Sequence, residues 1–257
     1  MSEAPDRLHR LQALVEVEAP ADAASDLAGR LDRICRASVQ ILAVAGVGVS
    51  VMDRAARPLG TIAASSPFVR RLEEVQFTLG EGPSVEASSA RSPVLEDDLT
   101  GSGARRWPAY AASAEEQGVA AVFAFPIQIG AARLGALVLY RKERGPLAHE
   151  VVLDALGLAR ICLNTMLSVP AAALSRDADG LGDADGLGDG DRLGDGDGLG
   201  LNSEVYQAQG VLTVQLGVPL TEAMLRLRAR AYATERPLDE VARDVLAGRI
   251  DLTRDDL

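Results

Sequence analysis

The side chains best suited to bond-making chemistry are few in this chain and lie far apart. It has two histidines, and its two cysteines, Cys35 and Cys162, are well separated. None has the spacing of a metal site or of a nucleophile beside its base. The adjacent carboxylates of Asp97 and Asp98 would point to opposite faces of a strand, which favours a surface or turn position. We therefore expect no catalytic residues, no metal ion and no enzyme.

Charge and hydropathy limit the partners. With 26 basic and 37 acidic residues the formal net charge is -11, which argues against broad adhesion to nucleic acid. The apolar runs, such as Val119–Ile129, are shorter than the roughly 18 residues that a membrane-spanning helix needs. The first residues lack the basic start and apolar run of a secretory signal. We expect a cytoplasmic protein without a membrane segment.

A repeat of aspartate, glycine and leucine divides the chain. From Arg176 to Gly200 the pattern Asp-x-Leu-Gly-Asp-x recurs every six residues. Such a segment buries too little apolar surface to offset its ordering entropy. The alternative, a calcium-binding β-roll, has a nine-residue repeat. We predict a flexible acidic linker over 169–200, which separates an N-terminal part from a C-terminal part, 201–257.

The N-terminal part shows helical and strand patterns in turn. The expected elements are a helix over 26–43, strands over 47–53 and 59–64, strands over 119–129 and 133–141, and a helix over 147–167. Helix, hairpin, connecting segment, hairpin and helix describe an antiparallel sheet with packed helices, an α+β fold. We place this domain at 24–168, after an N-terminal helical extension, 1–23.

Five motifs follow one another along this domain. They are Leu79–Ser84, Pro93–Leu99, Arg106–Tyr110, Gly118–Pro126 and Leu134–Arg141. In this order they resemble the GAF family, in the version found in bacterial GAF-ANTAR regulators. The resemblance implies a small-molecule or redox sensor, with a pocket roofed by the segment between the two hairpins.

We assign five residues to this implied ligand pocket: Glu81, Ser84, Trp107, Phe123 and Phe125. Ser84 stands where relatives often carry cysteine, so sensing by a thiol loses support. Gly80 and Gly82 allow backbone to approach a ligand or serve a tight turn. Trp107 covers the pocket mouth or packs at the start of a helix. Both histidines lie on probable helix surfaces, which disfavours haem. The ligand and any cofactor stay unidentified.

The C-terminal part reads as a bundle of three short helices. The patterns predict helices over 203–216 and 220–234 and a third that starts at Pro237 and stops at Gly248. Their motifs are Ala208–Leu212, Gly217–Val218, Ala223–Ala231 and Leu238–Ala242. These resemble an ANTAR domain over 204–250. The resemblance implies binding of paired RNA hairpins with six-base loops, and transcription antitermination when a sensor brings two such domains together.

Six side chains are candidates for that RNA interface: Gln209, Arg226, Arg228, Arg230, Arg236 and Arg243. Arg228 occupies the Leu-Arg position of the family, and the other arginines would meet phosphates. At 100° per residue, Arg228 lies on one flank of the apolar stripe and Arg226 and Arg230 on the other. The alternative for each arginine is a solvated helix face. Gln209 stands where relatives usually have lysine, and either reads a base or is buried and hydrogen-bonded.

The sequence thus predicts an antitermination regulator in which a GAF sensor controls RNA binding by an ANTAR domain. We expect a homodimer, to which the segment Pro5–Val17 contributes. The main alternative is a dimerisation or protein-docking module with a degenerate ANTAR domain that binds no RNA. A DNA-binding helix-turn-helix is disfavoured because the third helix carries Asp239, Glu240 and Asp244 outward.

Overall fold

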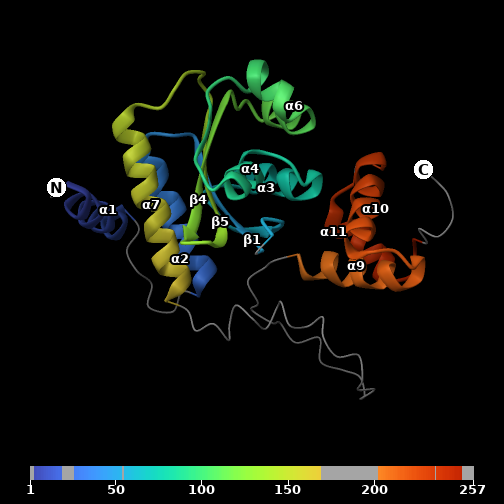
Figure 1. The fold of residues 1–257 in the computed structure, drawn as a ribbon. Helices are drawn as coiled ribbons and strands as arrows, with labels where there is room; N and C mark the ends of the chain where they lie inside the picture. The colour runs from blue at the N-terminus through green and yellow to red at the C-terminus, as the bar shows by residue number, and fades with distance from the viewer. Residues whose placement is uncertain (1–2, 19–25, 54, 169–201, 235, 251–257) are drawn as a thin grey trace. The chain divides into compact units, whose positions relative to one another are not determined.

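The computed structural model describes residues 3–18, 26–53, 55–168, 202–234 and 236–250 (Figure 1). The chain divides into two compact units, Met1–Val169 and Pro170–Leu257. The predicted acidic linker, 169–200, lies outside the described residues. No helix in the described part of the chain is long and apolar enough to cross a membrane.

A five-stranded antiparallel sheet forms the centre of the first unit, in the order β2-β1-β5-β4-β3. The strands are β1 (Gly46–Met52), β2 (Pro58–Ala64), β3 (Val94–Glu96), β4 (Ala121–Ile129) and β5 (Ala132–Arg141). Both predicted hairpins are present, and pairing of β1 with β5 joins them, with Val49 opposite Leu137. The predicted α+β fold class is confirmed.

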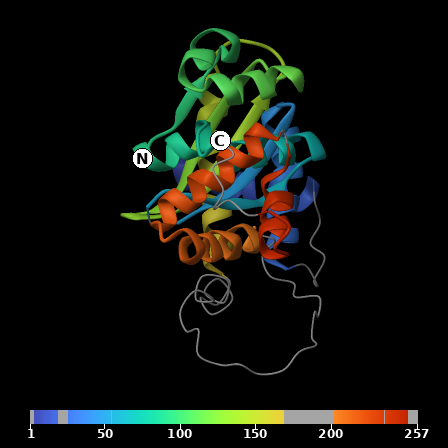
Figure 2. The same ribbon diagram turned by 90° about the vertical axis from the view of Figure 1, so that its right-hand side faces the viewer.

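Helices cover both faces of this sheet (Figures 1 and 2). The predicted α2 (Leu27–Leu42) and α7 (His149–Leu167) pack on one face. The other face is covered by the segment between the hairpins, which forms α3 (Pro67–Leu79), α4 (Pro83–Ala90), a short π-helix η1 (Leu99–Gly103), the short α5 (Ala104–Arg106) and α6 (Pro108–Glu116). Because both faces are covered, all seven residues of β1 are buried.

The two cysteines lie in the layer formed by α2 and α7. Cys35 and Cys162 are both free and wholly buried, as small apolar groups. Burial raises the pKa of the Cys162 thiol to about 12 and that of Cys35 well above its usual range. Neither thiol is therefore suited to act as a nucleophile.

The predicted N-terminal extension contains one helix, α1 (Glu3–Glu18), which packs on α2 and α7. Leu11 is wholly buried and presses on Gly157, where a Cβ atom would come within 2.5 Å of the leucine Cδ1. Asp154 pairs with Arg7 at 2.6 Å and with Arg10 at 3.0 Å. These contacts hold α1 against α2 and α7 of the same chain.

The second unit is the predicted three-helix bundle. Its helices are α9 (Ser203–Leu216), α10 (Leu220–Ala233) and α11 (Leu238–Leu246). Val205, Leu212, Leu227 and Val241 are wholly buried between them. Gly217 ends α9 in the left-handed region with a φ of 63°, as the sequence predicts.

Substitution of Gly135 in β5 tests the pairing of β1 with β5, which joins the two hairpins. A Cβ atom there would lie 1.9 Å from the carbonyl oxygen of Ser50, within the β1 backbone. We expect Gly135→Ala to lower the free energy of unfolding by about 1–3 kcal/mol or more, because a backbone clash forces the paired strands apart. Thermal and denaturant unfolding of the full chain measure this loss.

Gly157→Ala is the matched control, since its new methyl group meets only the flexible end of Leu11. Alanine also favours the helix by about 1 kcal/mol. Equal losses of stability in the two variants would contradict the account of β1–β5 pairing.

Candidate functional site

A continuous chain of buried hydrogen bonds lies on the sheet face covered by α3, α4 and α6. The Glu73 carboxyl group on α3 accepts hydrogen bonds from the hydroxyls of Ser50 on β1 and Tyr140 on β5. One turn further along α3, Gln76 donates its Nε2 to the Tyr140 hydroxyl at 3.3 Å. Its Oε1 accepts from both the backbone N–H and the hydroxyl of Ser84 on α4, at 2.8 Å each. These five residues, here called the Glu73 chain, join two strands to two helices.

The local sequence explains why these polar groups point inward. Glu73 and Gln76 fall three residues apart on the face of α3 that buries Val69, Leu72 and Phe77. Gly82 gives Gln76 its space, since a Cβ atom there would lie 2.6 Å from the glutamine Oε1. Gly80 and Gly82 have φ angles of 69° and 133°, which only glycine adopts readily, so they serve the tight turn between α3 and α4.

The Glu73 chain contains one acid, Glu73, and no group of opposite charge among the described residues pairs with it. Glu73 is about 1 % exposed, and no arginine, lysine or histidine of the described residues bonds to it. Burial raises the pKa of Glu73 to about 7, although the hydroxyls of Ser50 and Tyr140 favour the carboxylate and act in the opposite direction. Burial and the nearby Glu73 raise the pKa of Tyr140 well above its usual range.

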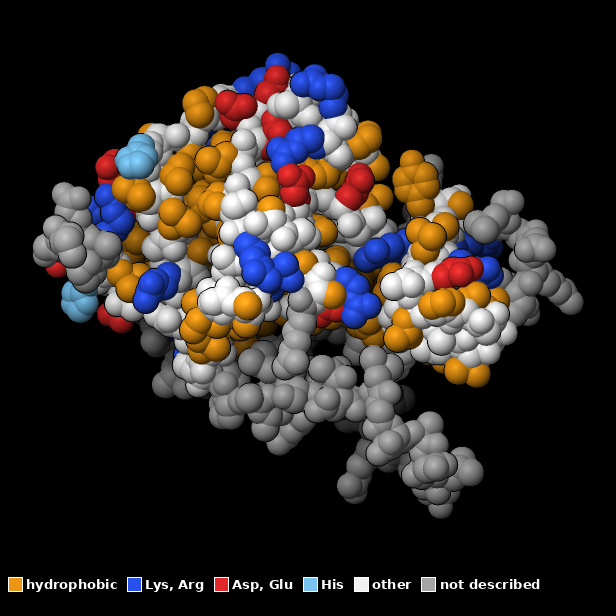
Figure 3. Space-filling model, viewed as in Figure 1, with side chains coloured by type: hydrophobic (Ala, Val, Ile, Leu, Met, Phe, Trp, Pro, Cys, Tyr) orange, Lys and Arg blue, Asp and Glu red, His pale blue; other side chains and the backbone are white. Residues whose placement is uncertain are grey.

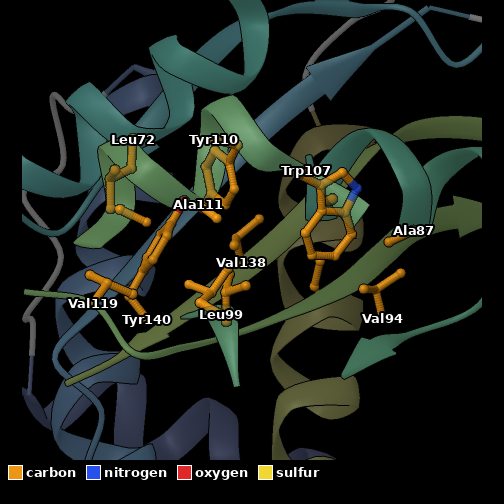
Figure 4. Packing of buried hydrophobic residues seen from close by; sticks show 14 of the residues in the cluster. Leu72, Ala87, Val94, Leu99, Trp107, Tyr110, Ala111, Val119, Val138 and Tyr140 are labelled. Atoms are coloured by element: carbon orange, nitrogen blue, oxygen red, sulfur yellow. The ribbon is translucent and has the colours of Figure 1, made fainter. Parts of the chain in front are cut away.

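Tyr110 on α6 adds an unsatisfied hydroxyl to this region. The residue is wholly buried, and its hydroxyl makes no hydrogen bond of good geometry to the described residues. Burial, and then the neighbouring Glu73, raise the pKa of Tyr110, and the Tyr140 hydroxyl lies close enough to act on it too. Tyr140 itself packs among Leu72, Ala111 and Val119 (Figure 4). The site is thus a cluster of polar side chains, in which hydroxyl groups surround the Gln76 amide and the Glu73 carboxyl, and apolar side chains enclose the cluster.

The structure places the predicted pocket residues in different surroundings. Ser84 belongs to the Glu73 chain, and Glu81 lies partly exposed in the turn between α3 and α4. Trp107 immediately precedes α6 and is 4 % exposed. It packs edge-on against Tyr110 with ring centroids 6.4 Å apart, and the Arg106 guanidinium lies 4.5 Å from its centroid (Figure 4). Of the two interpretations of Trp107, the structure therefore shows packing at a helix start.

Phe123 and Phe125 are not brought to this site, which corrects the grouping made from the sequence. Both are wholly buried on β4. Their neighbours Val122 and Ala124, however, belong to the apolar cluster that contains Trp107. Successive side chains of a strand point to opposite faces, so the two phenylalanines point toward the α2 and α7 side. The five predicted pocket residues therefore do not line one space.

Glu73, Gln76 and Tyr140 were missed by the sequence analysis. The signal lay in the segment 67–79, where apolar residues recur at helical spacing and an acid and an amide share their face. The strand position of Tyr140 was predicted, but nothing in the sequence alone paired it with a helix far away along the chain.

In the second unit, carboxylates neutralise most of the predicted RNA-binding arginines. Arg226 pairs with Glu222 at 2.8 Å, and Arg236 pairs with Asp244 at 2.8 Å. Arg243 pairs with Asp239 at 2.5 Å and with Glu204 at 3.2 Å. Gln209 is 7 % exposed and donates its Nε2 to the carbonyl of Leu220 at 2.7 Å, so the structure shows the buried, hydrogen-bonded alternative.

Arg228 and Arg230 on α10 differ from these. Neither forms an ion pair within the described part of the chain, and the Nε atom of each is buried without a hydrogen-bond partner. Desolvation lowers the pKa of Arg228, which remains charged, and the nearby Tyr206 acts in the opposite direction. Leu225 and Tyr232 share the Arg228 face of α10 and are 65 % and 68 % exposed.

No protein-family model and no curated protein sequence matches this chain. The first unit is similar in fold to solved GAF domains. That of the Acinetobacter phosphoenolpyruvate-protein phosphotransferase is 15% identical, covers 68% of this chain and 99% of its own, and gives a TM-score of 0.48. The corresponding domain from Coxiella burnetii is 19% identical, with coverages of 68% and 96% and a TM-score of 0.48.

The raised pKa of Glu73 predicts how stability depends on pH. A carboxyl whose pKa rises from 4.5 to about 7 on folding favours the folded state fully below pH 4.5. That contribution declines as the pH rises through 7, by up to about 3 kcal/mol. We expect Glu73→Gln, which stays neutral, to remove this decline, so that the difference in free energy of unfolding between variant and parent grows from pH 5 to pH 8.

Denaturant unfolding across this pH range measures the effect. The matched control is Glu74→Gln, a neighbouring substitution at an exposed position. Parallel pH profiles for the parent and Glu73→Gln would contradict a buried acid with a raised pKa.

Proposed function

We propose that the protein is a transcription antitermination regulator, in which the GAF-like first unit controls hairpin RNA binding by the ANTAR-like second unit. The observation that carries this proposal is the exposed face of α10. There Arg228, which has no ion pair among the described residues, shares a helix face with the exposed Leu225 and Tyr232, three residues before it and four residues after it.

Charge is the first reason to favour this face. Attraction to phosphate requires a cation that its own chain has not neutralised. Three of the five candidate arginines, Arg226, Arg236 and Arg243, already have carboxylate partners, whereas Arg228 and Arg230 have none in the described part. A half-buried guanidinium gains more from a phosphate or a base edge than a fully hydrated one, because part of its hydration is already lost.

The exposed aromatic ring is the second reason. Single-stranded loop bases are commonly held by stacking on aromatic rings beside arginine. Tyr232 follows Arg228 by four residues, so the two residues lie on the same helix face, within reach of one bound nucleotide. An unpaired loop base and its phosphate fit this pair better than a regular duplex does.

The sensing role rests on the GAF-like motifs and on the polar groups enclosed under α3 and α4. We assign no ligand and no cofactor. A homodimer is supported by apolar side chains gathered over α7 (Figure 3). Leu156 and Leu167 on α7 and Val17 on α1 are 41 %, 49 % and 73 % exposed, which suits a second copy of the chain. We place this regulator in the cytoplasm, where nascent RNA is made.

A docking module that binds no RNA is the second candidate. The exposure of Leu225 and Tyr232 favours it, since both offer apolar area to a protein partner. In that case Arg228 would pair with a carboxylate of the partner.

Substitution of Arg228 tests the proposal. We expect Arg228→Ala to weaken binding to a labelled two-hairpin RNA by about 5- to 150-fold, because one direct contact to a base or phosphate is worth about 1–3 kcal/mol. Arg226→Ala is the matched control on the same helix; its guanidinium is held by Glu222, so its effect should stay within about threefold. Titrations at fixed salt measure both.

The same RNA with scrambled loops and a duplex DNA complete the design. Binding of the parent protein to the two-hairpin RNA alone supports antitermination. Equal binding to all three nucleic acids, or binding to none, would overturn it, and binding to none would leave protein docking as the better account.

A further inference from the structure

The two helices α3 and α4 form a cover over one face of the sheet. The short turn Gly80–Gly82 connects them, and α4 begins without a side-chain cap. The helix α3 is bonded to the sheet by the Glu73 chain, since Glu73 meets β1 and β5 while Gln76 carries the connection on to Ser84. The helix α4 also bonds to β5 directly, because the Ser88 hydroxyl donates to the Gly135 carbonyl at 3.2 Å and Arg133 donates its Nε to the Ser88 carbonyl at 2.9 Å. The protonation state of one carboxyl therefore acts at the junction of the cover and the sheet.

None of the groups that face Glu73 supplies a positive charge. Tyr140 from β5 and Tyr110 from α6 are neutral phenols, and Cys35 from α2 is a neutral thiol that interacts with Glu73 electrostatically. Ser50 from β1 does not titrate, and β2 carries no titratable side chain. Glu86 on α4 pairs with Arg106 instead.

The two arginines on α3 itself do not pair with Glu73 either. Arg70 lies 3.9 Å from Asp32, and Arg71 bonds to Gln117. A proton on Glu73 is therefore what keeps this buried region neutral.

We propose that α3 and α4 are a proton-gated lid, which rests on the sheet while Glu73 is protonated and opens when Glu73 releases its proton to solvent. In the closed lid the ionised carboxylate has only two hydroxyl donors and no counter-charge. Opening lets water hydrate it, so loss of the proton shifts the equilibrium toward the open lid. The first unit then responds to protons directly, and this inference does not depend on RNA binding by the second unit.

The expected size of the response follows from linkage. Glu73 has a pKa of about 7 in the closed lid and an ordinary value of 4.5 when hydrated. Linkage between these two values makes the opening equilibrium about tenfold larger at pH 8 than at pH 6. The opening equilibrium rises between pH 4.5 and about pH 7 and levels off above that, so the response spans mildly acidic to neutral pH.

Hydrogen exchange of the full chain tests this device. Peptides from 67–90 are followed by mass spectrometry at pH 6 and pH 8, and their rates are corrected for the intrinsic pH dependence of amide exchange. We expect their protection to fall by about tenfold at pH 8, while peptides from α2 and α7 keep theirs.

Three variants make the test specific. Glu73→Gln should exchange equally at both pH values, and Glu74→Gln should behave as the parent does. Ser50→Ala removes one donor to the carboxylate and so raises the pKa of Glu73 in the closed lid, so protection should go on falling to a higher pH than in the parent and the midpoint of the loss should move up. A merely structural role for Ser50 would not shift that midpoint.

Several results would overturn the proposal. The proposal fails if the protection of 67–90 in the parent does not change with pH. It also fails if Glu73→Gln keeps the pH response. Equal loss of protection in α2 and α7 would show unfolding of the whole unit and no lid. If Glu73→Gln does not fold, the midpoint in Ser50→Ala decides, and an unchanged midpoint contradicts the gate.

Discussion

The first unit depends on how one buried carboxyl is accommodated. Glu73 meets hydroxyls from β1 and β5, the two strands whose pairing joins the hairpins, while its own helix covers that junction. Full desolvation of a charge without a partner costs far more than two neutral hydrogen bonds return. The packing of α3, α4 and α6 over the sheet is therefore compatible with a neutral acid, and each apolar neighbour in that layer keeps it neutral.

This constraint explains why polar and apolar groups are mixed under α3 and α4. An apolar residue at position 73 would pack on the same strands without sensitivity to pH. The combination of acid, amide and two phenols costs stability when the acid ionises, which is acceptable where a protein has to respond to its surroundings.

Much of the fold could be predicted because its signals are local. Alternating strands, a turn of Asp53 to Pro58 and amphipathic helices identify both hairpins, α2, α7 and the three helices of the second unit. The site could not be predicted to the same extent. Its bonds join residues up to 67 positions apart, as between Glu73 and Tyr140, and sequence spacing does not encode such contacts.

The pocket grouping failed for a related reason. Trp107, Phe123 and Phe125 are all buried, but strand alternation sends the two phenylalanines to the opposite face. In the second unit, helix geometry predicts that Arg228 and Arg230 lie on different flanks of α10. The sequence did not show which arginines form ion pairs. Their carboxylate partners come from other turns and helices, as with Glu204 beside Arg243.

The central claim is that burial raises the pKa of Glu73 in the folded protein to about 7, and carboxyl NMR tests it most directly. Glutamate labelled with ¹³C at the carboxyl carbon is titrated in the full chain, and the Glu73 signal is assigned by its absence in Glu73→Gln. The account predicts a signal that titrates with a midpoint of about 7, while exposed glutamates titrate near 4.5. A Glu73 midpoint close to 4.5 would contradict it.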